Sequence, residues 1–342
     1  MTANAELEPQ GHVSAIVPTF KRLDILPQCL TGIEAQRFSL TEIIVAYRPD
    51  DDPQTAVWLE TNKKSHPLWV LVPLYQSGQV AALNAALAIA KGKILAIFDD
   101  DAVPRPDWLQ KVLVHFLDES VAAAGGRDLV HGHDGIVTKP VLRKAGYRDY
   151  WGNVIGGHHL VVGRSREVDV LKGCNWALRR TALGTLHLDE RLLGAGAQPA
   201  NDYWLCLILR HAGWKIILDP EAIVDHYPGT KPDYQHGTWP RVKCFEWTAN
   251  ETATRLAFAP WHLKLRYILY HIAIGHRNCP GAYYVIHSVL RRPRSLPGQL
   301  VGGWSGISLG FRMAREFGRS PPGAVVYRTQ RDGSPKDRNN FD

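Results

Sequence analysis

The sequence lacks the long apolar segments that anchor a chain in a membrane. No run of about 18 uncharged apolar residues occurs, so we expect no transmembrane helix. Residues 1–11 have neither a basic start nor an apolar stretch, and we expect a disordered tail without a signal peptide. The content of 45% hydrophobic and 21% charged residues is nevertheless typical of a globular protein.

Closely spaced cysteines are also missing. The five cysteines lie far apart, their number is odd, and none forms a CxxC pair. This spacing argues against a disulfide framework and against a cysteine-rich zinc site. Reduced cysteines in a cytoplasmic protein are the expected alternative.

Two nucleotide-binding signatures are absent from the first turn of the chain. A GxGxxG motif, which a dinucleotide oxidoreductase would carry after its first strand, does not occur there. The turn reads Thr19-Phe20-Lys21-Arg22, so the glycine-rich basic loop of a sugar nucleotidyltransferase is missing too. The net charge of +7 suits an anionic ligand, but no nucleic-acid-binding motif accompanies it, and we expect no nucleic-acid partner.

What the sequence does contain is a regular alternation of apolar runs and helical segments. The predicted strands are 13–18, 42–47, 68–73 and 93–98, and the predicted helices are 24–36, 55–64, 78–90 and 106–117. Such alternation predicts an α/β fold with a mostly parallel sheet covered by helices on both faces. Further on, we expect loops over 127–172, a helix over 201–212 and two short strands at 215–218 and 222–225.

Acidic clusters follow two of these strands. Asp99, Asp100 and Asp101 come directly after the strand that ends at Phe98. Three adjacent negative charges repel one another, and a bound cation would relieve this repulsion. Mn²⁺ or Mg²⁺ prefers oxygen ligands and often shares them with phosphates, and ligands of parallel sheets bind at the strand ends. Asp50, Asp51 and Asp52 form a second cluster, which is either a solvated turn or a ligand site.

Two further residues have competing interpretations. His226 follows a strand and is either a packed histidine or, if it faces the acidic triplet, an additional metal ligand. Asp202 stands beside Asn201 where a helix is predicted to begin, and the residues alone favour a helix cap over a general base.

Taken together, these segments resemble the family-two inverting glycosyltransferases, which have a Rossmann-like GT-A fold. The most specific block is Ala96-Ile-Phe-Asp-Asp-Asp-Ala-Val-Pro-Arg-Pro-Asp-Trp-Leu109, which is similar to the strand, DxD motif and helix start of that family. The resemblance covers residues 12–228, which we expect to form the GT-A domain. Residues 229–342 are expected to form a helical C-terminal extension.

The resemblance implies a role for each matching residue. The nucleotide-sugar donor would be bound by residues at the strand ends and around them, namely Pro18, Thr19, Phe20, Asp50, Asn84, Asp99, Asp100 and Asn175. A divalent metal, Mn or Mg, would be held by Asp101, Asp99 and His226. Asp202 matches the catalytic base of the family.

Two departures from the family pattern bear on these roles. The usual Glu-Asp pair reads Asn201-Asp202, which keeps the base but removes its acidic neighbour. The QxxRW motif of processive polymer synthases is absent, because 235–239 has neither its spacing nor its arginine.

The expected function is inverting transfer of a sugar from a nucleoside-diphosphate sugar to an acceptor hydroxyl, in bacterial-type polysaccharide or glycolipid synthesis. The acceptor would be a glycan or a lipid-linked molecule. A non-catalytic scaffold that binds nucleotide sugars or glycans is the alternative. Aromatic and basic residues intersperse after residue 229, which suits either an anionic membrane surface at the inner face of the plasma membrane or an ordinary helical subdomain.

Overall fold

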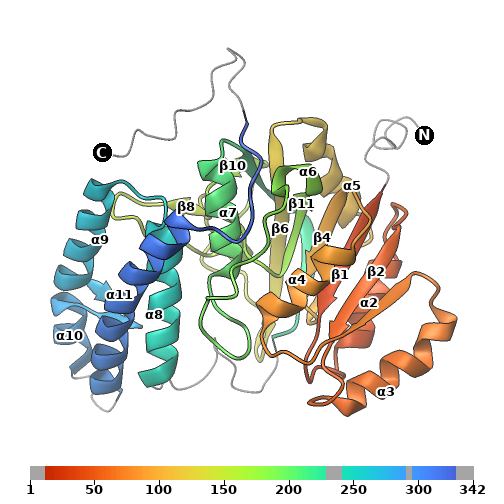
Figure 1. Cartoon of the computed structure of the whole chain (residues 1–342), viewed down its shortest axis with the longest axis horizontal. Helices are drawn as coiled ribbons and strands as arrows, with labels where there is room; N and C mark the ends of the chain where they lie inside the picture. The colour runs from red at the N-terminus through yellow and green to blue at the C-terminus, as the bar shows by residue number, and fades with distance from the viewer. Residues whose placement is uncertain (1–11, 229–240, 290–294, 329–342) are drawn as a thin grey trace.

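The computed structural model describes residues 12–228, 241–289 and 295–328. The predicted tail at 1–11 and the 235–239 segment lie outside these residues. A curled, mostly parallel sheet occupies the centre, and four helices, α8 to α11, stand together at one end (Figure 1). Among the described residues, no helix is both long and apolar enough to cross a membrane.

The central sheet has the strand order β10-β12-β6-β11-β4-β1-β2-β3. Its strands are β1 (Val13–Pro18), β2 (Glu42–Tyr47), β3 (Trp69–Pro73), β4 (Ile94–Phe98), β6 (Val121–Gly132), β10 (Arg166–Val168), β11 (Asn175–Arg179) and β12 (Lys215–His226), with β5 (Ala102–Pro104) and β7 (Gly135–Ile136) at its margins. Strands β1 to β4 pair in parallel, and β11 lies antiparallel between β4 and β6. The parallel strands therefore end at one edge, as the sequence predicts.

The helices sit on two faces because side chains alternate along each strand. Ile16 of β1 faces one hydrophobic cluster with α4 (Gln79–Ile89) and α7 (Asn201–His211), whereas Ala15 and Val17 face a second cluster. That second cluster includes α2 (Leu26–Glu34), α3 (Pro53–Asn62) and α5 (Trp108–Leu113). The sheet thus forms the middle of three layers.

Several boundaries differ from the sequence expectation. The two short strands predicted at 215–218 and 222–225 are one strand, β12, with a register irregularity between Asp219 and Ile223. The predicted helix over 106–117 is the shorter α5, followed by the 3-10 helix η3 (Val114–Leu117). At the β12 irregularity the backbone comes very close to β6, since a Cβ on Gly126 would lie 1.8 Å from the carbonyl oxygen of Ala222.

The segment from 127 to 172 is mostly irregular, as predicted. Besides the end of β6 and the short strands β7 and β10, it contains the short elements β8 (Tyr147–Arg148), β9 (Val154–Ile155) and the 3-10 helix η4 (His158–Leu160). The remaining short elements are η2 (Lys63–Ser65), α6 (Arg180–Leu183), β13 (Gly275–His276) and β14 (Cys279–Pro280).

The C-terminal extension consists of α8 (Arg241–Leu256), α9 (Trp261–Ala273), α10 (Ala282–Val289) and α11 (Leu296–Arg319). α8 and α11 pack along each other, and their residues Ala253 and Phe317 belong to the same hydrophobic cluster as α7. After α11 the chain returns to the sheet domain, where the indole nitrogen of Trp214 donates to the carbonyl of Val326 at 2.6 Å. The extension is therefore joined to the sheet domain through a continuous core.

Candidate active site

A cavity of about 600 Å³ lies at the ends of the parallel strands, and we call it the strand-end cavity. Pro18, Thr19 and Phe20 reach it from the end of β1, and the acidic triplet reaches it from the end of β4. The N-terminus of α7 and residues of α8 close its other side. This location is the one at which open parallel sheets bind ligands.

The three acids of the triplet have different surroundings. Asp99 Oδ1 accepts from Gln79 Nε2 at 3.2 Å, and an Asp100 oxygen accepts from the backbone of Phe20 at 3.3 Å. Asp101 forms an ion pair with Arg22. Burial and the neighbouring charge of Asp101 raise the pKa of Asp99 to about 6 and that of Asp100 to about 8. A bound cation would offset this repulsion.

Strand pairing brings His226 to the triplet. β12 runs antiparallel to β5, so that His226 is opposite Ala102 and its Nε2 lies 3.2 Å from Asp101 Oδ1. Its other nitrogen, Nδ1, lies 3.0 Å from Oδ2 of Asp128, which is fully buried on β6. Burial works against a charged imidazole, but the hydrogen bonds to the two aspartates prevail and raise the pKa of His226 to about 9.

Asp128 is balanced by a second cation. Lys172 forms an ion pair with its Oδ2, and this pair together with His226 holds the pKa of Asp128 below its usual range although burial acts in the opposite direction. The other oxygen, Oδ1, is buried and has no hydrogen-bond partner in the part of the chain that the structure describes. A chain of charges therefore runs from Lys172 through Asp128 and His226 to Asp101.

Two sets of atoms at this position could hold a metal. Asp101 Oδ1 and His226 Nε2 are 3.2 Å apart, close to the separation of about 3 Å between neighbouring ligands of an octahedral ion at roughly 2.1 Å. Ligand atoms of Asp128, Cys174 and His226 also lie within 4.8 Å of one another. The Cys174 sulfur is a soft ligand, whereas Mn²⁺ and Mg²⁺ prefer harder donors. Asp101 and His226 therefore fit a divalent metal such as Mn²⁺ or Mg²⁺ better, provided that the metal replaces the proton on the imidazole, because a ligating imidazole is neutral.

Asp202 lines the same cavity, at the second residue of α7. Its Oδ2 accepts from the backbone of Gly173 at 2.9 Å, and its Oδ1 accepts from the backbone of Tyr203 at 2.8 Å. The helix cap favoured from the residues is wrong, because Ala200 occupies the cap position without a side-chain bond. Burial raises the pKa of Asp202 to about 6, which is suitable for a general base near neutral pH.

Three residues that the sequence assigns to the donor lie outside the cavity lining. Asp50 is exposed beyond the end of β2. The Asn84 amide accepts from the backbone of Leu188 at 2.8 Å and so fastens α4 to a loop. The Asn175 oxygen accepts from the backbone of Gly126 at 2.7 Å within the sheet. The donor role of these residues stays a prediction.

Other lining residues were not found from the sequence. Arg22 and Lys172 bring positive charge to the acids, and Arg48 lies over the Phe20 ring, 4.7 Å from its centre. Arg22 and Arg48 stand in the turns that follow the predicted strands 13–18 and 42–47. This position could have identified them as candidate residues of a strand-end site. Trp247 and Glu251 come from α8, and no local sequence pattern connects them to this cavity.

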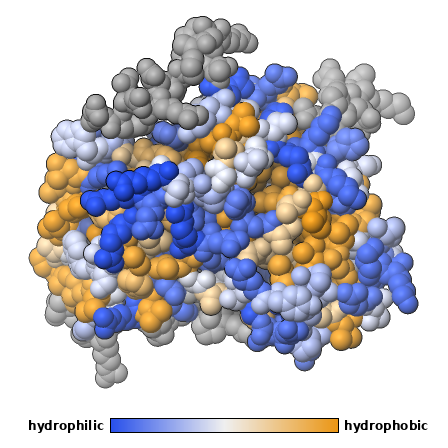
Figure 2. Space-filling model, in the orientation of Figure 1, coloured by the Kyte–Doolittle hydropathy of each residue, from blue (hydrophilic) through white to orange (hydrophobic). Residues whose placement is uncertain are grey.

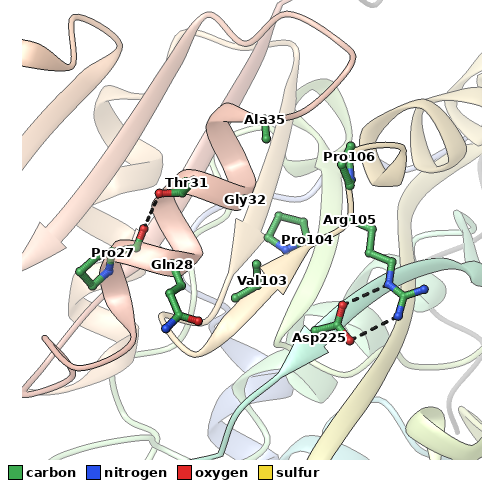
Figure 3. A pocket seen from close by; sticks show the side chains of 10 residues that line it. All are labelled: Pro27, Gln28, Thr31, Gly32, Ala35, Val103, Pro104, Arg105, Pro106 and Asp225. Carbon is green, nitrogen blue, oxygen red and sulfur yellow. Dashed lines mark hydrogen bonds and ion pairs between the residues drawn. The ribbon is translucent and has the colours of Figure 1, made fainter.

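A second hollow, of about 460 Å³, lies between α2 and β5 (Figure 3). Val103, Pro104 and Pro106 give it an apolar floor, and its charged side chains, Arg105 and Asp225, are bound to each other at 3.1 Å. These two charges are therefore already paired. The strand-end cavity remains the candidate for chemistry.

The sheet order and the strand-end acids define a protein with the GT-A fold. Residues 9–238 match the model of the family described as glycosyltransferase-like family 2. The chain belongs to this family.

Relatives and solved structures agree with this assignment. The pre-mycofactocin glycosyltransferase of Mycobacterium tuberculosis is 23% identical over 216 residues, which are 63% of this chain and 42% of that protein. The chain spans less than half of the length of the curated relatives it matches. S. aureus TarS 1–349 in complex with UDP-GlcNAc has a TM-score of 0.55 and 14% identity, with 85% of this chain and 79% of that chain covered.

A second solved structure is the mannosyltransferase PcManGT from Pyrobaculum calidifontis in complex with GDP-Man and Mn²⁺. It has a TM-score of 0.50 and 20% identity, with 90% of this chain and 86% of that chain covered. At these identities, both structures support the fold.

Proposed function

We propose that the protein transfers a sugar from a nucleoside-diphosphate sugar to an acceptor hydroxyl with inversion at the anomeric carbon. The observation that carries this proposal is the meeting of Asp99, Asp101, His226 and Asp202 in one cavity at the strand ends. Membership of glycosyltransferase-like family 2 supports it. The nucleotide sugars bound by TarS and PcManGT support a donor of this class.

In this proposal the donor lies over the end of β1 and β4. Phe20 and Arg48 contact the nucleoside, and Arg22 and Lys172 face the diphosphate. Asp101 and His226 would hold the divalent metal, with Asp99 beside them. When bound, such a metal offsets the negative charge that develops on the departing diphosphate. Its presence in PcManGT, as Mn²⁺, supports a divalent ion without deciding between Mn and Mg.

The chemical step needs one base. Asp202 accepts the proton of the acceptor hydroxyl while the hydroxyl oxygen forms a bond to the anomeric carbon. The bond between that carbon and the diphosphate oxygen breaks, and its electron pair leaves with the diphosphate. The two backbone N–H groups that bind the Asp202 oxygens hold the carboxylate in place. A single displacement of this kind inverts the anomeric configuration.

The direct test is to incubate the protein with a panel of UDP, GDP and dTDP sugars, with Mn²⁺, with Mg²⁺ and with EDTA. We expect slow hydrolysis of one donor or a few related donors, dependent on the metal. An Asp99→Asn, Asp101→Asn double variant is the inactive control. If no donor is hydrolysed or bound under any condition, the proposed function is wrong.

We propose in addition that the extension contacts an anionic membrane surface, which would suit glycolipid synthesis. Along α9, Trp261, Leu265, Leu269 and Ile272 are 49% to 69% exposed and fall on one face of the helix. Apolar residues gather at the edge of the molecule where α9 and α10 lie (Figure 2). Between Glu251 and Glu316 the sequence has no Asp or Glu and nine Lys or Arg residues. This charge complements anionic lipid.

Flotation with liposomes tests the membrane contact. We expect binding to phosphatidylserine-containing vesicles at low salt, and loss of binding in a Leu265→Glu variant, because a charge on the apolar face opposes insertion. Val57→Glu is the matched control, since Val57 is 66% exposed on α3 in the sheet domain. Equal flotation of both variants, or no flotation of the unmodified protein, would contradict the proposed membrane contact.

A further inference from the structure

Helix α8 of the extension forms part of the wall of the strand-end cavity. Trp247 and Glu251, one helical turn apart, line it together with Tyr203 of α7. α7 stands between α8 and strands β1 and β4 (Figure 1). Asp202, at the start of α7, lines the same cavity as the strand ends and the α8 wall. An acceptor must approach Asp202 from a side that the donor does not occupy, and α8 supplies that side.

The carboxylate of Glu251 is held in a fixed position. Its Oε1 accepts from Nη2 of Arg255 at 2.8 Å, and both side chains are less than 10% exposed. Arg255 is held in turn by Asn153, whose Oδ1 accepts from Nη1 at 3.3 Å. A buried ion pair is costly to maintain, and replacing it with apolar residues often leaves stability unchanged or improves it. The position of the Glu251–Arg255 pair at the cavity wall therefore indicates a role in ligand binding rather than in stability.

The second oxygen of Glu251 has capacity to accept hydrogen bonds. Oε2 lies 3.9 Å from Nε2 of His276, beyond hydrogen-bond distance. Burial lowers the pKa of His276, so the imidazole is neutral and does not neutralise this oxygen. A ligand hydroxyl in the cavity would find a carboxylate oxygen in a fixed position.

Trp247 and Tyr203 add flat apolar surface beside this carboxylate. Both rings line the cavity and are partly buried. A pyranose ring has an apolar face of C–H groups and a rim of hydroxyl groups. Aromatic rings beside a fixed hydrogen-bond acceptor match both features, as in other pockets that combine apolar walls with few polar groups.

We infer that Trp247 and Glu251 form a subsite for a pyranose unit of the acceptor, so that the acceptor is a glycan or glycoside. The aromatic ring packs on the C–H face of the sugar, and Glu251 accepts from one of its hydroxyls. A neighbouring hydroxyl is then placed toward Asp202. This inference rests on the proposed function and specifies the substrate class that the same site accepts.

The test separates the two claims by using donor hydrolysis and transfer as distinct readouts. A donor found to be hydrolysed is offered with methyl and octyl pyranosides of glucose, galactose, mannose and N-acetylglucosamine. Products are identified by mass spectrometry, and the KM for the pyranoside is measured in Trp247→Ala, in Glu251→Gln and in Tyr327→Ala. Tyr327 is 50% exposed, outside the cavity lining and outside the proposed membrane face, and provides the aromatic control.

We expect at least one pyranoside to be glycosylated. Trp247→Ala and Glu251→Gln should each raise its KM by about tenfold, the effect of losing roughly 1.4 kcal/mol of binding. Donor hydrolysis without acceptor should stay within about twofold of the unmodified protein in all three variants, because the proposed donor position over β1 and β4 leaves α8 to the acceptor. A lower KM for the octyl form assigns the subsite to lipid-linked sugars, and equal values assign it to soluble glycans.

Three outcomes would overturn the inference. The first is donor hydrolysis with no transfer to any pyranoside, which would leave the proposed donor site intact. The second is an unchanged pyranoside KM in Trp247→Ala, the variant that keeps the Glu251–Arg255 pair and so its fold. The third is an equal loss of donor hydrolysis and transfer in both α8 variants, which would mean a structural role. Absence of donor hydrolysis itself would instead contradict the proposed function.

Discussion

The two ends of the strand-end cavity are built from opposite kinds of chemistry. At the strand ends, Asp99, Asp100 and Asp101 line the cavity with Arg22 and Lys172, and Arg22 pairs with two of these acids. At the α8 end, Tyr203 and Trp247 line the cavity together with Glu251, whose carboxylate pairs with Arg255. The first arrangement suits a charged diphosphate with a metal, and the second suits a neutral sugar. One cavity can therefore separate donor from acceptor by charge alone.

Asp202 lines the cavity together with both ends, and its replacement should have the largest effect. Asp202→Asn keeps the size of the side chain but removes the base, so we expect transfer to fall by about 10²–10⁴-fold. Donor and metal binding should remain, which calorimetry can measure. Asp134→Asn, the same change at a fully exposed loop residue, should have no effect. Near-normal turnover by the Asp202 variant would show that the two ends do not meet at this residue.

Replacement of Asp128 should weaken metal binding at the strand ends while leaving both proposed metal ligands, Asp101 and His226, in place. Its Oδ2 lies 3.0 Å from Nδ1 of His226, an arrangement that orients the ring so that Nε2 faces Asp101. Carboxylates that orient a metal-binding histidine typically contribute about 10–100-fold to metal affinity. We expect a loss of Mn²⁺ affinity of this size in Asp128→Asn, measured by calorimetry. Unchanged affinity would mean that His226 is not a ligand.

The pH dependence should report the base when saturating divalent metal keeps the triplet ionised, because the pKa of Asp99 is also raised to about 6 without a cation. Because the pKa of Asp202 is raised to about 6, the carboxylate is ionised above that pH and becomes protonated below it. We therefore expect kcat/KM for the acceptor to fall by about tenfold per pH unit as the pH decreases below 6. In Asp202→Asn the remaining activity should lose this slope. A flat profile between pH 5 and 7 in the unmodified protein would contradict the assignment.

The position of the acidic triplet at a strand end was predictable from sequence, because the triplet directly follows its strand. An apolar run ending in Asp99-Asp100-Asp101 identifies a strand end whatever the rest of the chain does, and the parallel sheet then places it beside Thr19. His226 was harder, since its approach to Asp101 depends on the antiparallel pairing of β12 with β5. From the sequence alone, His226 was either a packed histidine or a residue that faces the acidic triplet.

The α8 end could not be predicted in this way. Trp247 and Glu251 reach the cavity only because α8 packs on α7 and α11, contacts between segments far apart in the chain. Asp128 is another example, because a lone aspartate in a strand gives no sign of the histidine it will meet. Asp50 was given a donor role because an acidic turn follows its strand, and this role stays a prediction, since the exposed side chain lies outside the cavity lining.

The central claim is that the strand ends form a metal-dependent nucleotide-sugar site, and donor titration tests it most directly. Nucleotide sugars are titrated by calorimetry into the unmodified protein and into Asp101→Asn, each with Mn²⁺ and with EDTA. The account predicts binding of at least one nucleotide sugar that requires Mn²⁺ and is lost in Asp101→Asn. Equal binding with Mn²⁺ and with EDTA, in both proteins, would contradict it.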